Sequence, residues 1–316
     1  MFNLIRLIQN ENMKIYYRPG TWVMFAILIS ILLIIGIFTK FIIEDPANSN
    51  WQETVLAENV NKQMAVDDAS LPGTMREVYQ RDIILNDYRL EYDIPPVETK
   101  SFWGYITSAV NLISIITMFT IIVAAGMVAS EFSWGTIKLL LIRPVSRAKI
   151  LLSKYIVTFL FALLMLLVLF AFSFAIGGSF FGASTITHPY LYFEGGNVVE
   201  RNMIVHLVML YGLSSVELLM MVTFAFMIST VFRSSSLAIG LALFLMFTGT
   251  QLVYVLSQYQ WVKYILFANT YLGQYIEGTP IVEGMTMTFS LVVLAVYFIT
   301  FNALTWIVFQ KRDIAA

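Results

Sequence analysis

The sequence of 316 residues contains no cysteine and only two histidines, and charged residues make up 12% of it. Without cysteine there is no disulfide frame, no thiolate chemistry and no Cys-ligated metal site. The charged fraction is about half of that in soluble globular domains, which argues against a water-soluble enzyme. His188 and His206 lack the spacing of a metal site, and no Ser, His and acid trio is evident. We therefore expect neither a metal nor a catalytic site.

A second absence concerns nucleotide. A P-loop requires a Gly-Lys-Ser/Thr step, and Gly is nowhere followed by Lys in this chain. The chain therefore cannot bind ATP by that route. We expect a protein that is not an enzyme and that carries no cofactor of its own.

Apolar residues make up 59% of the chain and gather into long blocks. Each block is long enough to cross a hydrocarbon core of about 30 Å at about 1.5 Å per residue. The pattern predicts an all-α polytopic membrane protein with six transmembrane helices. The first block is too long for the apolar core of a signal peptide, so we expect it to stay in the mature chain. The predicted spans are 21 to 41, 105 to 129, 155 to 179, 204 to 231, 237 to 256 and 286 to 309.

The distribution of charge predicts the orientation of these spans. With the N-terminus inside, the inner segments hold eleven cations against three acids, and the outer segments hold eight cations against sixteen acids. Loops rich in Lys and Arg stay on the cytoplasmic side. We therefore expect both ends of the chain in the cytoplasm.

The segments between the spans differ in kind. Residues 1 to 20 alternate apolar and polar side chains at a helical period, which predicts an amphipathic helix at the inner interface. Residues 44 to 101 are expected to form an extracellular helical hairpin broken at Pro72-Gly73, or alternatively a solvated acidic loop. Residues 180 to 203 are expected to be an extracellular loop, and residues 310 to 316 a cytoplasmic tail. The aromatic segment 257 to 285 predicts short re-entrant helices at the outer interface.

Two helix faces and one acid inside the spans are candidates for a translocation path. Small and weakly polar residues often serve only to pack membrane helices together, but these faces can also form a gate lined by Phe and Met. Glu217 is the one intramembrane acid. For Glu217 we favour a structural or gating role over proton transfer, because the chain has no internal repeat of the kind that secondary carriers show. The candidate gate residues are Asn111, Ser114, Met118, Phe244, Phe247 and Gln251.

The inner segment 131 to 149 carries a motif. Glu131 is followed by the pair Gly135-Thr136, then by a Leu pair ending at Leu140, and then by a Pro-x-Ser-Arg step and Lys149. This order and spacing resemble the signature of ABC-2 type permeases, the membrane subunits of bacterial ABC exporters. The aromatic segment 261 to 275 and the basic C-terminal segment 309 to 314 fit the same family. With six spans, the resemblance covers nearly the whole chain.

The resemblance implies an ATP-driven exporter in the bacterial plasma membrane. In that family the segment 131 to 149 is a cytoplasmic coupling helix that docks on a separate P-loop ATPase, present in two copies that bind ATP and Mg. A second permease chain, identical or homologous, and membrane lipids are the other implied partners, and nucleic acid is not one. The implied substrate is amphipathic: an antimicrobial peptide, a drug or a lipid-like molecule. The implied docking residues are Glu131, Gly135, Thr136, Leu140, Arg143, Pro144, Ser146 and Arg147.

Three alternatives stay open. The segment 131 to 149 can be a basic loop that only maintains topology. The chain can be a proton-coupled secondary carrier that uses Glu217. It can also be a membrane scaffold or sensor that transports nothing and binds a partner through its extracellular hairpin.

Overall fold

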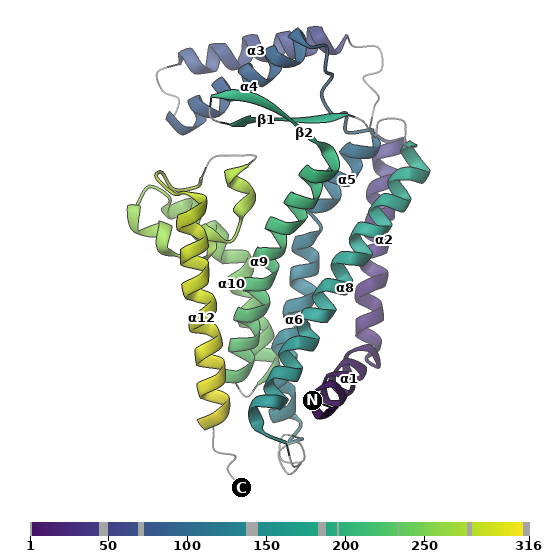
Figure 1. Ribbon diagram of the computed structural model, residues 1–316, viewed down its shortest axis with the longest axis vertical. Helices are drawn as coiled ribbons and strands as arrows, with labels where there is room; N and C mark the ends of the chain where they lie inside the picture. The colour runs from purple at the N-terminus through teal and green to yellow at the C-terminus, as the bar shows by residue number, and fades with distance from the viewer. Residues whose placement is uncertain are drawn as a thin grey trace.

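A computed structural model describes residues 2–43, 50–68, 73–136, 145–182, 188–194, 196–232, 234–276 and 280–311. Within these residues six helical segments are long and apolar enough to cross a membrane, so the chain is an α-helical, multi-pass membrane protein. The spanning helices run side by side, with α1 (Phe2–Tyr16) lying across one end of the bundle (Figure 1). We call this end the base. The spans are α2 (Pro19–Phe41), α5 with α6, α8 (Arg147–Phe181), α9 (Met203–Val231), α10 (Ser235–Leu256) and α12 (Met287–Lys311).

The second span is interrupted. The prediction was one continuous helix over 105 to 129, but the structure has α5 (Phe102–Val110) and α6 (Ile113–Ser133) joined by a turn at Asn111 and Leu112. At this turn the amide of Asn111 donates to the carbonyl of Ser108, which is the tighter spacing of a 3₁₀ turn. The hydroxyl of Ser114 donates to the carbonyl of Asn111 at 2.7 Å. Polar side chains therefore occupy the point at which the helix changes direction.

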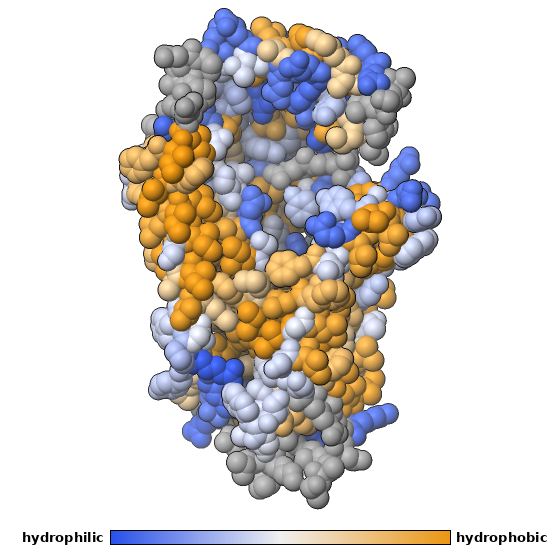
Figure 2. Space-filling model, turned by 180° about the vertical axis from the view of Figure 1, so that it is seen from behind, coloured by the Kyte–Doolittle hydropathy of each residue, from blue (hydrophilic) through white to orange (hydrophobic). Residues whose placement is uncertain are grey.

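This interrupted span lies at the centre of the bundle. Of its most apolar stretch, 78% is buried, compared with 17% for α10 and 17% for α12. α6 packs against α8, α9 and α10, and α12 packs against α9. The peripheral helices leave broad apolar surface uncovered, as the orange band across the middle of the molecule in Figure 2 shows. Such a band suits contact with lipid or with a second membrane protein.

The opposite end of the molecule carries a folded unit that we call the cap, made of α3 (Trp51–Asp67), α4 (Gly73–Glu91), β1 (Pro189–Glu194) and β2 (Asn197–Asn202) (Figure 1). Polar contacts join α3 to α4. Asn59 donates to Asp87 at 2.8 Å and accepts from Asn86 at 2.9 Å. Val55 is the one buried residue of α3. The two helices therefore form a hairpin with little apolar core of its own.

The two cap strands differ from the prediction of an irregular loop over 180 to 203. They pair antiparallel with Tyr190 opposite Arg201 and Tyr192 opposite Val199. Gly196 sits in the connecting turn at φ +92°, a conformation that glycine adopts readily. The Arg201 guanidinium lies 3.9 Å from the ring centre of Tyr192. Alternate aromatic residues at 190 and 192 carry the local signal for a strand, but the neighbouring apolar spans dominate the hydropathy pattern.

The aromatic segment before α12 folds into three short helical turns, η1 (Gln260–Tyr264), α11 (Leu266–Asn269) and η2 (Leu272–Tyr275). The buried side chain of Asn269 holds them together. Its amide donates to the carbonyls of Lys263 and Ile265 at 2.8 Å, and its oxygen accepts from Ser290 of α12 at 2.7 Å. The segment is therefore anchored to the last span.

Candidate functional site

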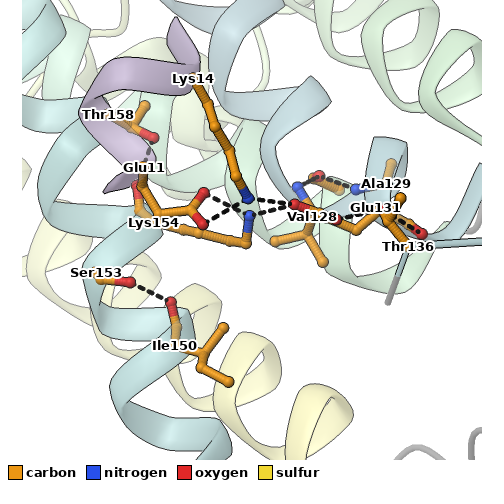
Figure 3. A network of polar contacts seen from close by, with 11 residues as sticks. Glu11, Lys14, Val128, Ala129, Glu131, Thr136, Ile150, Ser153, Lys154 and Thr158 are labelled. Atoms are coloured by element: carbon orange, nitrogen blue, oxygen red, sulfur yellow. Dashed lines mark hydrogen bonds and ion pairs between the residues drawn. The ribbon is translucent and has the colours of Figure 1, made fainter. Parts of the chain in front are cut away.

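A group of charged side chains at the base joins three helices (Figure 3). Glu11 and Lys14 come from α1, Glu131 from the last turn of α6, and Lys154 from the third turn of α8. Together with Thr136, which follows α6, we call these residues the charge cluster. α6 and α8 are the helices that precede and follow residues 137 to 146. The cluster therefore lies where the segment that carries the motif joins these two helices.

Each lysine of the cluster contacts both carboxylates. The Lys154 ammonium donates to Glu11 Oε2 at 2.7 Å and to Glu131 Oε1 at 3.0 Å. The Lys14 ammonium donates to Glu11 Oε1 at 2.8 Å and to Glu131 Oε1 at 2.9 Å. Lys154 is only 1% exposed, and both carboxylates are buried. Two negative charges and the charge of Lys154 are therefore held out of water, and the partly exposed Lys14 makes the cluster neutral.

The protonation of Lys14 is consistent with this balance. Burial by itself lowers the pKa of the Lys14 ammonium. The hydrogen bonds that Lys14 donates to Glu11 and Glu131, together with the negative charges of these two carboxylates, outweigh burial, so the pKa lies above its ordinary value. Lys14 is therefore positively charged at neutral pH. Taking one member out of such a buried group leaves an uncompensated charge, which typically costs about 3–5 kcal/mol. The three helices are thus expected to move together at this end.

Gly135 and Thr136 explain part of the motif in physical terms. Gly135 follows the C-terminal end of α6 at φ +69°, and its amide donates to the carbonyl of Phe132 at 3.2 Å. A glycine in this left-handed conformation is the common way to close a helix. The turn brings the Thr136 hydroxyl back to the Glu131 carboxylate, to which it donates. The Glu, Gly and Thr of the motif therefore form one local structure that orients the Glu131 carboxylate toward the lysines.

The position of Glu131 changes the role that we assign to it. The resemblance implied direct contact with an ATPase, but its carboxylate is engaged inside the chain by Lys14, Lys154 and Thr136. The neighbouring Trp134 is 67% exposed instead, with the Arg18 guanidinium 5.4 Å from its ring centre. Trp134 and Gly135 thus present the accessible surface beside the cluster.

The other docking candidates are distributed around the start of α8. Ser146 caps that helix, and its carbonyl accepts from the amide of Lys149 at 3.0 Å. The Arg147 guanidinium donates to the carbonyl of Gln310 at 3.2 Å, which links the start of α8 to the end of α12. Leu140, Arg143 and Pro144 lie outside the described residues.

The candidate gate residues lie on exposed faces. Asn111 and Ser114 are exposed and Met118 is half-buried on the α5–α6 span. On α10, Phe244 is 61% and Phe247 is 57% exposed, and Gln251 is exposed as well. The buried residues of α10 are on its other face, which packs on α6. Within the described part of one chain these candidates therefore lie on outward faces, and their role in a path stays a prediction.

Glu217 and the histidines lie away from the charge cluster. Glu217 is partly buried on α9, and no described residue forms a hydrogen bond or an ion pair with it. His188 contacts the carbonyl of Pro95 at 2.7 Å, and the ring of His206 stacks on Tyr190 with centres 3.4 Å apart. Both histidines therefore support the cap.

Glu11 and Lys14 were not among the site residues predicted from sequence. The available signals were local: Glu11 is the one acid in an otherwise basic N-terminal segment, and Lys154 stands at the edge of a long apolar run. Neither signal states which residue is the partner. Glu11 and Lys154 are 143 positions apart, so their pairing becomes visible only in the folded chain.

The chain is similar to two proteins whose names state no activity, one of which is named a membrane protein. "Uncharacterized protein YhcI" of Bacillus subtilis (strain 168) is 46% identical over 316 residues, which cover 99% of this chain and 100% of the relative. "Uncharacterized membrane protein YdbK" of the same organism is 31% identical over 218 residues, which cover 68% of this chain and 84% of the relative. The family model described as "Protein of unknown function (DUF2705)" matches residues 78–315, and the chain therefore belongs to that family.

Proposed function

We propose that this chain is the permease subunit of an ABC-2 type exporter in the bacterial plasma membrane, driven by a separate P-loop ATPase. The observation that supports the proposal is the charge cluster, which joins α1 to the two helices that flank residues 137 to 146. It couples both helices that flank residues 137 to 146 to the helix that lies across the base. A force applied to this segment is therefore passed to three helices at once.

The direction of coupling follows from the packing. α6, which holds Glu131, is the most buried part of the bundle and contacts α8, α9 and α10. Its backbone near Glu131 is further held by Ser229 of α9, whose hydroxyl accepts from the amides of Val128 and Ala129 at 3.2 and 3.0 Å. A displacement at the base therefore reaches the centre of the bundle through direct contacts.

The remaining parts of the proposal are topological. The excess of Lys and Arg at the base favours a cytoplasmic base and an extracellular cap. Two copies of the ATPase bind ATP and Mg, and two permease chains meet through the exposed faces of α5–α6 and α10. Between these faces an amphipathic substrate moves outward. Phe244, Phe247 and Met118 provide the soft apolar wall that such a substrate needs.

Site-directed photocrosslinking tests the proposed partner. Trp134, which follows α6 at the base, is 67% exposed, and Trp261, in η1 between α10 and α12, is 55% exposed, so the two side chains form a pair matched in exposure. Each is replaced in turn by p-benzoylphenylalanine, and the chain is crosslinked in cells and purified. We expect a P-loop ATPase, identified by mass spectrometry, crosslinked to position 134 and absent at 261. Failure to recover any such ATPase at 134, or its recovery equally at both positions, would refute the proposal.

The unpartnered acid on α9 favours one rival, a proton-coupled carrier. The Glu217→Gln variant separates the two mechanisms. If the chain is an ATP-driven exporter, transport by this variant still depends on ATP and does not change with the proton gradient. A carrier loses gradient-driven transport with this substitution and needs no ATP. A scaffold that transports nothing shows no substrate-stimulated ATPase activity in the purified complex.

A further inference from the structure

The cap lines one side of a partly open cavity of about 810 Å³. Its walls come from α3, α4, the extended segment 95–100 and β1, and Ile276 reaches it from the turns before α12. In Figure 2 a recess opens between the cap and the apolar band, on the cap side of the molecule. Pockets of about 300–1,000 Å³ are the usual size for small-molecule sites. The cavity is therefore large enough for a ligand of that class.

The charge of the cavity wall is opposite in sign to that of its surroundings. The lining has four cations, Lys62, Arg81, Arg89 and Lys100, against three acids. The segments on this side of the spans hold eight cations and sixteen acids in total. Two of the three lining acids, Glu58 and Asp82, are already paired with Lys62, at 2.7 and 2.9 Å. Four cations against three acids give the lining a net charge of +1.

Arg89 is the cation that these contacts leave available. Its guanidinium donates to Asn86 Oδ1 at 2.9 Å, and no carboxylate of the described residues lies within the 4.0 Å of an ion pair. Burial lowers the pKa of this guanidinium, the negative charges of Glu58 and Asp82 partly oppose that effect, and an arginine stays protonated. A planar, partly desolvated guanidinium with no described carboxylate in direct contact is well suited to bind a carboxylate or a phosphate in bidentate fashion.

Part of the wall is apolar. Trp51, Val55 and Leu85 line the cavity from α3 and α4, and Tyr192 lines it from β1. Val55 is 3% exposed. Apolar and aromatic side chains with a few placed polar groups are typical of sites for amphipathic ligands. The cavity therefore offers one anion-binding group and a surface for an apolar body.

We propose that the cap cavity binds an amphipathic anion, with its carboxylate or phosphate at Arg89 and its apolar body against Trp51 and Leu85. The site goes beyond the proposed export function and does not rest on it. Binding requires this chain alone, with neither ATPase nor ATP. A failure of ATPase recovery at Trp134 would leave the cavity proposal standing, and the reverse also holds.

A fluorescent fatty acid, 11-(dansylamino)undecanoate, is a suitable probe. The full chain is placed in nanodiscs of phosphatidylcholine, and binding is followed by energy transfer from Trp51, with Trp51→Phe as the reference that lacks this donor. We expect Arg89→Gln to weaken binding at least about tenfold, since a hydrogen-bonded charged group is lost. The matched control is Arg76→Gln on the same helix. Its guanidinium donates to the carbonyls of Val66 and Asp68 and lies outside the cavity, so affinity should stay unchanged.

Competitors define the chemical class. Decanoate and decyl phosphate should displace the probe, whereas decanol and decyltrimethylammonium should not. Displacement by inorganic phosphate at equal concentration would overturn the claim that the apolar body of the ligand contributes to binding. Nanodiscs containing phosphatidylglycerol should weaken probe binding if the anion comes from a lipid headgroup, and should leave it unchanged if the anion is a free amphiphile.

A second variant tests the cavity independently, in case Arg89→Gln fails to fold. Leu85→Trp fills the cavity from the same helix and keeps Arg89, so it should also weaken probe binding. The proposal is overturned if Arg89→Gln and Leu85→Trp both bind the probe as tightly as the unmodified chain, or if decyltrimethylammonium displaces it as well as decanoate does.

Discussion

Replacing Lys154 with methionine should destabilise the chain far more than the same replacement at Lys62. Both lysines contact two carboxylates at nearly equal distances, 2.7 and 3.0 Å for Lys154 and 2.7 and 2.9 Å for Lys62. Their surroundings differ. The side chain of Lys154 is 2% exposed and that of Lys62 is 20% exposed, with Glu58 beside it 49% exposed. The pair therefore separates the effect of burial from that of geometry.

The expected magnitudes follow from this difference. Lys154→Met leaves Glu11 and Glu131 with Lys14 as their one remaining cation, an unbalanced buried charge that costs about 3–5 kcal/mol. Lys62→Met removes ion pairs that water already screens, with an expected cost of about 0.2–1 kcal/mol. Methionine keeps the apolar stem in both cases, so the comparison reports mainly on charge.

The free energy of unfolding is measured by titration with sodium dodecyl sulfate, followed by tryptophan fluorescence of the purified chain. The double variant Lys154→Met with Glu131→Gln restores a neutral cluster of Glu11 and Lys14. We expect it to lose less than the sum of the two single variants, with a coupling of about 2 kcal/mol. Equal losses for Lys154→Met and Lys62→Met, or a coupling below about 0.5 kcal/mol, would contradict our interpretation of the cluster.

Three further predictions concern the helix ends and the topology. Gly135→Ala should destabilise the chain by about 1 kcal/mol, because the left-handed conformation disfavours a side chain although space is available; thermal unfolding measures this. Gly104→Ala should reduce the yield of folded chain in size-exclusion chromatography, because its Cβ would lie 2.1 Å from the carbonyl oxygen of Glu98. An impermeant maleimide should label Val60→Cys in intact cells and Trp134→Cys only after permeabilisation; the cysteine-free background makes the reverse pattern decisive against a cytoplasmic base.

The six spans were predictable because the signal for a membrane helix is local. Lipid cannot satisfy backbone polar groups, so each span must be largely helical and apolar, and such a run is visible in the sequence itself. The motif at Glu131, Gly135 and Thr136 was also visible, since a helix end and the turn after it involve neighbouring residues. These features depend on contacts within a few positions of the chain.

The interruption at Asn111 and the cap strands were missed for a related reason. A single asparagine costs little in the hydropathy of a long apolar run, so the run predicts one helix although the backbone turns there. Among the described residues the strands at 189–202 pair with each other, and they rest on α4 and on the start of α9. Their short alternation is weak beside the spans that flank them.

The sequence by itself therefore determined the number of spans, the apolar character of the chain and the likeness of its motif to a family. Only the tertiary structure decided that Glu131 faces Lys14 and Lys154, and that Arg89 lines a cavity without an ion pair to any described carboxylate. The physical reason is distance along the chain. A buried charge needs a partner, but composition and periodicity cannot name a partner more than a hundred residues away.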